Sequence, residues 1–235
     1  MKKDLLLIIL LFILSCSNHI SLDHLYPSDD LIIENLDDWG KENYKKMINE
    51  FKNNPLSYGD IVFLGNSITQ GGNDWSERLN YPNIKNRGIG GDVTDGVLSR
   101  IDEIGYFKPK AVFLLIGIND LWNNGSPNKP SAEYIGNNII KIIQAINVQT
   151  PKTKIYVQTV LPIEKEEYRL NIIKVNEIIK AKEKENPYEI IDLYSIFVNQ
   201  DGLIKKELST DGIHLNEKGY DTWVKFIKPS INSLD

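Results

Sequence analysis

Cysteine and histidine are scarce in this chain of 235 residues. The single cysteine, Cys16, excludes an intramolecular disulfide. Of the three histidines, His19 and His24 lie near the N-terminus and His214 lies near the other end of the chain. One histidine without a thiol does not make a zinc site, although carboxylates alone could hold a hard cation. We therefore expect no metal site and no cofactor.

Several ligand-binding patterns are also missing. The formal net charge of −5 provides no basic surface of the kind that binds nucleic acid. The glycine-rich stretch at 88–91 fails the G-x-G-x-x-G test for dinucleotides, because Val93 occupies the position of the third glycine. No G-x-x-x-x-G-K-[ST] phosphate loop occurs either. We therefore expect a partner other than nucleic acid or a dinucleotide.

The chain begins with a segment typical of export. Lys2 and Lys3 precede an almost wholly apolar run at 5–14, which is too short to span a membrane as a helix. The ending Ile-Leu-Ser-Cys resembles a bacterial lipobox, whose cysteine is lipidated and becomes the first mature residue; an ordinary cleaved signal peptide is the alternative. We expect a lipoprotein signal peptide at 1–15 and an exported protein held by acyl chains on Cys16 at the periplasmic face or cell surface.

The rest of the chain is predicted to form one domain. We interpret 16–36, which is polar and aperiodic, as a tether, and 37–235 as a domain with a sizeable core. Apolar spacing predicts helices at 37–54, 93–104, 131–149 and 163–185, and strands at 61–64, 84–89, 111–117, 154–160 and 189–193. Strands separated by helices require a parallel sheet with right-handed crossovers. The predicted fold is a three-layer α/β/α sandwich with a five-stranded parallel sheet.

The first predicted strand ends in Gly65-Asn66-Ser67. Ligands of open α/β sheets bind outside the carboxyl ends of the strands, so Ser67 is placed where a nucleophile would act. Serine is also a common helix N-cap, which is the structural alternative. The G-x-S-x-G elbow of α/β-hydrolases is absent, because Ile68 and Thr69 follow the serine. A catalytic Ser67 would therefore belong to a different fold.

A candidate base lies near the end of the chain. His214 is the sole histidine of the predicted domain, and Asp211 precedes it by three residues. A carboxylate at this spacing can bind one ring nitrogen and fix the tautomer, which leaves the other nitrogen to accept a serine proton. A histidine with a purely structural role is the alternative. Two further loops follow predicted strands, at 88–92 and 117–120; by themselves they indicate ordinary turns, the first with Asp92 as a helix cap.

Together these loops resemble a known family. Residues 59–229 are similar to SGNH hydrolases of the GDSL-like lipase/acylhydrolase superfamily, particularly its platelet-activating-factor acetylhydrolase-like branch. The resemblance is carried by four motifs in the family's order: Gly65-Asn66-Ser67, Gly88-Ile89-Gly90-Gly91-Asp92, Gly117-Ile118-Asn119-Asp120 and Asp211-Gly212-Ile213-His214.

The resemblance implies a flavodoxin-like SGNH hydrolase fold and a role for each motif. It makes Ser67 the nucleophile, His214 the base and Asp211 the residue that orients the base. It also makes the backbone N–H of Ser67, together with Gly91 and Asn119, the oxyanion donors, with Gly90 as the other candidate in the glycine loop. The family's usual Gly-Asp-Ser is Gly-Asn-Ser here, so a neutral amide must make the hydrogen bond of that aspartate.

The substrate is less constrained by the sequence. Trp75 and Trp122 lie close in sequence to the serine and the asparagine and could form an aromatic wall for a sugar or an acyl group, or could simply pack in the core. The sequence has no long apolar insertion of the kind that could form a lipid-binding lid. We predict a serine esterase that removes short acyl groups, in particular acetyl, from glycans. A lysophospholipase or short-chain lipid esterase is the alternative, followed by a non-catalytic glycan-binding lipoprotein.

Overall fold

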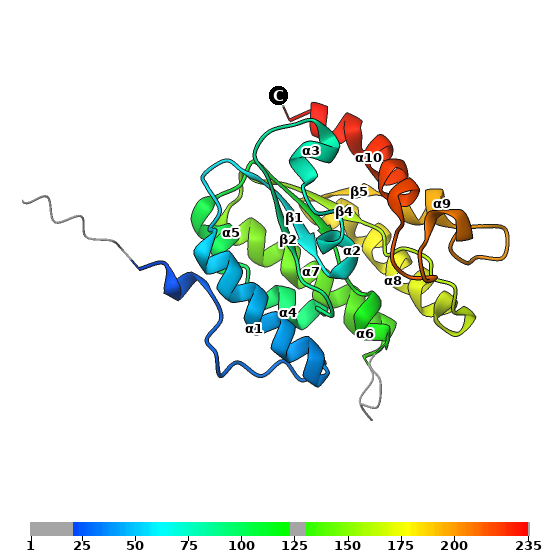
Figure 1. Cartoon of the computed structure of the whole chain (residues 1–235), viewed down its shortest axis with the longest axis horizontal. Helices are drawn as coiled ribbons and strands as arrows, with labels where there is room; N and C mark the ends of the chain where they lie inside the picture. Colours follow the sequence, from blue (N-terminus) through cyan, green and yellow to red (C-terminus); the bar gives the residue numbers. More distant parts are fainter. Residues whose placement is uncertain (1–20, 123–129, 235) are drawn as a thin grey trace, which may run out of the picture.

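Five parallel strands form one sheet in the order β2-β1-β3-β4-β5 (Figure 1). The computed structural model of the protein describes residues 21–122 and 130–234, so the expected signal peptide and Cys16 lie outside the described residues. Each strand agrees with a predicted one to within two residues: β1 (Ile61–Gly65), β2 (Ile84–Gly88), β3 (Ala111–Leu115), β4 (Lys154–Gln158) and β5 (Glu189–Ile191). The predicted five-stranded parallel sheet is confirmed.

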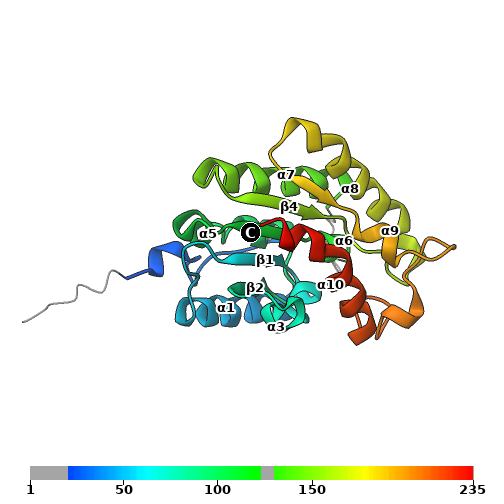
Figure 2. The same ribbon diagram turned by 90° about the horizontal axis from the view of Figure 1, so that it is seen from above.

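Helices cover both faces of this sheet. They are α1 (Asp38–Asn53), α2 (Ser67–Gln70), α3 (Trp75–Leu79), α4 (Thr94–Leu98), α5 (Asp102–Phe107), α6 (Ile118–Trp122), α7 (Ala132–Gln149), α8 (Arg169–Lys182), α9 (Leu193–Phe197) and α10 (Glu217–Asn232). Helices α3 and α10 pack together on one face, and α7 packs against α4, α5 and α8 on the other (Figure 1). Helix α1 lies beside β2 at the edge of the sheet (Figure 2). The three-layer α/β/α sandwich is therefore confirmed.

Aromatic rings fill the core between the sheet and α3. Phe63, Phe113 and Tyr156 are register partners on β1, β3 and β4, and their rings stack with centroid distances of 4.9 and 4.6 Å. Trp75 of α3 stacks on Phe63 at 4.3 Å, and Trp223 of α10 packs on Trp75. Trp75 is completely buried. The prediction that Trp75 could contact substrate is therefore wrong, because its apolar ring is needed to cover the sheet.

The predicted helix at 93–104 is interrupted. The chain forms α4 and α5 instead, and the turn between them brings the Arg100 side chain back to the Asp92 carboxylate and the Gly65 carbonyl. Asp92 is not the helix cap either, because the N-cap residue of α4 is Val93, without a side-chain cap. A buried ion pair therefore replaces the predicted continuous helix.

Two further segments differ from prediction. Of the expected tether, Leu25, Tyr26, Ile33 and Leu36 are buried in the core, so the described residues 21–36 belong to the domain. The apolar residues of this segment do not follow the spacing of a helix or a strand. They are buried all the same, because an irregular segment can lie across the core and cover it. The predicted helix at 163–185 begins only at α8, after a short 3-10 turn (Glu166–Tyr168), and α10 was not predicted at all.

Candidate active site

Ser67 begins α2 directly after β1, at the carboxyl edge of the sheet. Asn66 is the N-cap of this short helix, and its side-chain Oδ1 accepts a hydrogen bond from the Ile68 N–H at 3.0 Å. A carbonyl oxygen accepts such a bond as a carboxylate does, so the neutral amide serves in place of the family's usual aspartate. Ser67 follows the cap with its side chain partly exposed. The departure from Gly-Asp-Ser therefore leaves the geometry of the turn intact.

The loop before α10 brings His214 to the serine. The His214 Nε2 lies 3.0 Å from Ser67 Oγ, and its Nδ1 lies 2.7 Å from Asp211 Oδ2. The other carboxylate oxygen accepts the backbone N–H groups of Ile213 and His214 at 3.0 and 2.8 Å. Partial burial raises the pKa of the Asp211 carboxyl, but the hydrogen bonds from His214 and Ile213 outweigh it and hold this pKa below its ordinary value. Asp211 therefore remains a carboxylate at neutral pH and orients the ring.

The glycine loop after β2 faces the serine. Gly91 has φ +82°, and a Cβ there would meet the Trp39 ring at 3.0 Å, so a side chain is excluded both by backbone strain and by contact. The N–H of Gly90 donates to Gln70 Oε1 at 2.8 Å, whereas Gly91 lines the pocket beside Ser67. Of the two candidate glycine donors, Gly91 is therefore the one whose N–H has no acceptor among the described residues.

Asn119 completes the set of predicted donors. Its amide Nδ2 donates to the Asp92 carbonyl oxygen at 2.9 Å and the residue lines the same pocket as Ser67 and Gly91. An amide nitrogen carries two N–H groups, so one bond orients the amide and leaves the second for a substrate oxygen. The predicted residues Ser67, Gly91, Asn119, Asp211 and His214 are thus brought together at one edge of the sheet.

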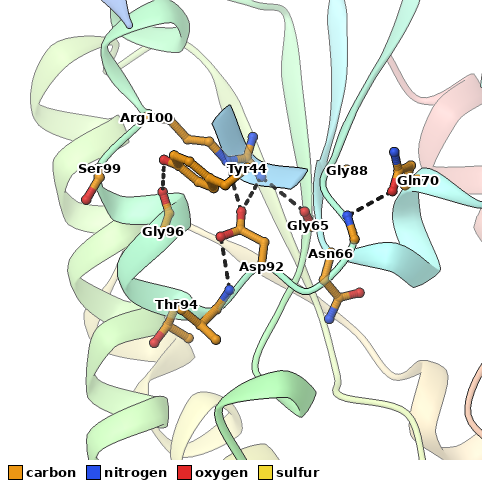
Figure 3. A network of polar contacts seen from close by, with 12 residues as sticks. Tyr44, Gly65, Asn66, Gln70, Gly88, Asp92, Thr94, Gly96, Ser99 and Arg100 are labelled. Atoms are coloured by element: carbon orange, nitrogen blue, oxygen red, sulfur yellow. Dashed lines mark hydrogen bonds and ion pairs between the residues drawn. The ribbon is translucent and has the colours of Figure 1, made fainter. Parts of the chain in front are cut away.

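A buried ion pair supports the glycine loop from behind (Figure 3). The Arg100 guanidinium binds the Asp92 carboxylate at 2.8 Å and donates to the Gly65 carbonyl at 3.0 Å, and both side chains are almost fully buried. Burial raises the pKa of Asp92 to about 6, while Arg100 counteracts the rise. Tyr44 of α1 donates to the Gly96 carbonyl and holds α4 against α1. This network joins the glycine loop to the end of β1, where Ser67 lies.

A second buried carboxylate joins the glycine loop to Asn119. Asp120 is completely buried and accepts hydrogen bonds from the Thr94 N–H, at 3.1 Å to each oxygen, and from the Thr94 hydroxyl. No cation within the described residues forms an ion pair with Asp120. Burial is the largest cause that raises the pKa of Asp120, to about 7, against the hydrogen bonds from Thr94. Asp120 thereby couples the loop after β3 to the start of α4.

The serine opens into a pocket of about 300 Å³. Trp122 forms part of its wall, as predicted; its ring stacks on Tyr168 at 5.5 Å and lies 3.5 Å below the Lys165 ammonium. Another part of the wall was not predicted from the sequence. It comes from the start of α1 and the segment before it: Asn35, Asp37 and Trp39. The Trp39 side chain is 62% exposed although its helix packs on the core. An exposed tryptophan out of step with the buried face of a helix is a signal that could have indicated this role.

Two further features concern metals and membranes. Within 21–122 and 130–234, no group of three or more His, Cys, Asp or Glu side chains is arranged to hold a metal ion. The same residues contain no helix with the length and apolar character needed to cross a bilayer.

Comparison with known proteins identifies the family. Residues 63–222 match the model of the GDSL-like Lipase/Acylhydrolase family. Human platelet-activating factor acetylhydrolase IB subunit alpha2 is 32% identical over 178 residues, which cover 72% of this chain and 73% of the relative. A GDSL-like lipase from Bacteroides thetaiotaomicron has the same fold, with a TM-score of 0.70, 24% identity and coverage of 81% and 98%.

An acetyl-xylooligosaccharide esterase from Geobacillus stearothermophilus, at 20% identity, also shares the fold, with a TM-score of 0.62 and coverage of 75% of this chain and 95% of that one. Fold, family match and relatives agree with the resemblance predicted from the four motifs. The chain belongs to the GDSL-like lipase/acylhydrolase family and is a hydrolase of ester bonds.

Proposed function

We propose that the protein is a serine esterase in which Ser67 attacks the carbonyl carbon of a carboxylic ester. The observation that carries this proposal is the 3.0 Å contact between Ser67 Oγ and His214 Nε2 inside a pocket that also contains Gly91 and Asn119. A serine hydroxyl is a weak nucleophile at neutral pH and needs a base within hydrogen-bond distance. Neutral His214 accepts the serine proton as the C–O bond forms, and Asp211 stabilises the resulting imidazolium.

Attack converts the carbonyl oxygen into an oxyanion. The N–H groups of Ser67, Gly91 and Asn119 are neutral donors from three separate loops, and each such donor is commonly worth about 3 to 4 kcal/mol in the transition state. The imidazolium of His214 then protonates the departing alcohol, which leaves an acyl group on Ser67. Water attacks this acyl-enzyme after giving a proton to His214, and the carboxylic acid departs as Ser67 recovers its hydrogen.

We propose further that the acyl group is short, specifically acetyl, and that the alcohol belongs to a carbohydrate. The pocket is small, and two tryptophans, Trp39 and Trp122, present aromatic surface to it, with the polar side chains of Asn35 and Asp37 beside them. Apolar walls with a few polar groups suit a sugar ring, whose faces are apolar and whose hydroxyls need partners. The name of the acetylhydrolase relatives supports an acetyl group, and the acetyl-xylooligosaccharide esterase shows that this fold can serve a glycan.

A lipid ester is the second candidate, because the relatives are named for platelet-activating factor. Rates with p-nitrophenyl acetate, butyrate and octanoate would define the acyl length, and acetylated xylo-oligosaccharides compared with platelet-activating factor would define the alcohol. We expect acetate to be the best acyl group and the acetylated sugar to exceed the lipid in kcat/KM. A preference for octanoate or for the lipid would contradict the carbohydrate proposal but not the serine mechanism.

We also propose that Cys16 is lipidated and tethers the exported protein to a membrane. The proposal rests on the basic, apolar and Ser-Cys sequence of the first sixteen residues. In bacteria that process lipoproteins, the protein should partition into the membrane fraction and carry acyl chains by mass spectrometry. Cys16→Ser should release it or leave it unprocessed. An unchanged protein without acyl chains would rule the anchor out.

A further inference from the structure

The amino ends of the strands form a surface that the ester chemistry does not use. Four lysines lie where the chain enters β3 and β4: Lys108, Lys110 and Lys152 in the two preceding turns, and Lys154 as the first residue of β4. All four are exposed and border a depression of about 660 Å³. No carboxylate among the described residues forms an ion pair with any of them. The whole chain has a net charge of −5, so this group of lysines without ion pairs is a positive region on a protein that is negative overall.

Exposed apolar side chains accompany these lysines. Tyr58 is 67% exposed and Val148 is 80% exposed, and each precedes a residue that borders the depression, Gly59 and Gln149. The Tyr58 ring contacts that of Tyr106, which is also exposed, at 6.0 Å. We call the four lysines together with Tyr58, Tyr106 and Val148 the basic face. Such a combination matches the membrane interface, where tyrosine rings sit at headgroup level and lysine stems lie along apolar surface with their ammonium groups in water.

The described chain also starts at this end of the molecule. The 3-10 turn Asp23–Leu25 packs against α5 (Figure 2). The His24 ring lies 6.4 Å from that of Tyr106. Ser21 is five positions after Cys16, so the two residues are at most about 18 Å apart in an extended chain. An acyl anchor on Cys16 would therefore hold the basic face close to the bilayer. Ser67 lies beyond the carboxyl end of β1, at the opposite end of the same sheet.

We propose that the basic face docks on the surface of an anionic lipid bilayer. Lysines near such a surface are attracted by its negative charge, and the attraction falls off within a Debye length. Docking in this orientation points the pocket of Ser67 away from the membrane, toward esters in the surrounding water. A competing explanation is that Lys108 and Lys152 only offset the dipoles of α5 and α7, whose C-terminal ends they follow. That role needs no lipid, so a lipid-dependent measurement separates the two.

The test uses the full chain reconstituted in vesicles of pure phosphatidylcholine or of phosphatidylcholine with phosphatidylglycerol. Brief acylation of lysines followed by mass spectrometry reports the accessibility of each ammonium group. We expect acylation of the four basic-face lysines to fall about fivefold or more in the anionic vesicles and to recover in about 0.5 M salt. Exposed Lys206 and Lys218, near the other end of the sheet, should be acylated equally in both.

Charge reversal sharpens the test. The double variant Lys108→Glu/Lys152→Glu should abolish the protection of Lys110 and Lys154, whereas the matched control Lys206→Glu/Lys218→Glu should retain it. Lys108 and Lys152 are exposed and lie at the opposite end of the sheet from the serine, so hydrolysis of p-nitrophenyl acetate by the Lys108→Glu/Lys152→Glu variant reports separately on folding and on the esterase. Equal acylation in both kinds of vesicle would overturn the proposal. Equal protection by inorganic phosphate without vesicles would also overturn it, by assigning the lysines to a small-anion site.

Discussion

Two sets of carboxylates at the same end of the sheet differ in their contact with water. Asp211 is half exposed, and its pKa is held low by hydrogen bonds from its own loop. Asp92 and Asp120 are completely buried behind the glycine loop, and burial raises the pKa of both. The exposed carboxylate serves the histidine that contacts the serine, whereas the buried pair fix the backbone that carries the oxyanion donors. The carboxylate that assists the reaction is therefore in contact with water, whereas the carboxylates that hold the loops in place are buried.

The largest effect is expected from the serine itself. Ser67→Ala removes the nucleophile, and we expect kcat/KM to fall by at least about 10⁴-fold with the fold unchanged. An active-serine fluorophosphonate should label the parent protein but not the variant. Ser195→Ala, which changes an exposed serine of α9, is the matched control and should keep full activity. Labelling that persists in Ser67→Ala would show that another residue is the nucleophile.

The exposed carboxylate is tested next. In Asp211→Asn, an amide N–H facing Nδ1 would favour the tautomer with the proton on Nε2, which cannot accept the serine proton. We expect kcat to fall by about 10³- to 10⁴-fold, and His214→Ala to be at least as damaging. A His214→Ala variant that keeps more than about a tenth of kcat/KM would exclude this imidazole as the base.

The buried ion pair should affect stability more than chemistry. Asp92→Asn leaves the Arg100 guanidinium buried without its carboxylate, which should cost about 3 to 5 kcal/mol of unfolding free energy. Urea denaturation would measure the loss, and Asp92→Asn/Arg100→Met should recover part of it. Glu185→Gln breaks the exposed pair with Lys182 and should change stability by less than about 1 kcal/mol. Equal effects of Asp92→Asn and Glu185→Gln would remove the distinction between buried and exposed pairs.

The buried carboxylate without a cation should give a pH signature. The pKa of Asp120 is raised from 3.8 to about 7 in the folded protein. The protonated side chain therefore contributes fully to stability at a pH below the pKa of the unfolded chain, and this contribution is lost as the pH rises through about 7. Asp120→Asn keeps a carbonyl acceptor for Thr94 but cannot ionise. Relative to the parent, the variant should therefore gain stability, on the order of a few kcal/mol, between about pH 4 and pH 8. A difference in unfolding free energy that is constant with pH would mean that Asp120 is not titrating.

The smallest effect is expected at the pocket wall. Trp39→Ala should raise KM for an acetylated sugar several-fold, at a cost of about 1 kcal/mol, and leave kcat for p-nitrophenyl acetate nearly unchanged. Trp75→Ala should instead destabilise the fold by about 3 to 5 kcal/mol, because that ring is completely buried. Steady-state kinetics and urea denaturation of the two variants would compare the exposed tryptophan with the buried one. An unchanged KM in Trp39→Ala would remove this residue from the binding site.

The sequence by itself determined the parallel sheet, the residues of each strand and the loops that carry Ser67, Asn119 and His214. These features are local, because apolar spacing reports burial along a strand or helix and a loop after a parallel strand always emerges at the same edge. Only the tertiary structure decided which side chains meet across the chain. It paired Asp92 with Arg100 at the expense of a continuous helix, buried Trp75 under α10 and brought Trp39 to the pocket from the start of α1, a helix for which no role in the site was predicted. Such contacts depend on how elements that are distant in the sequence pack together. The spacing of apolar residues within one element does not predict which other element it will contact.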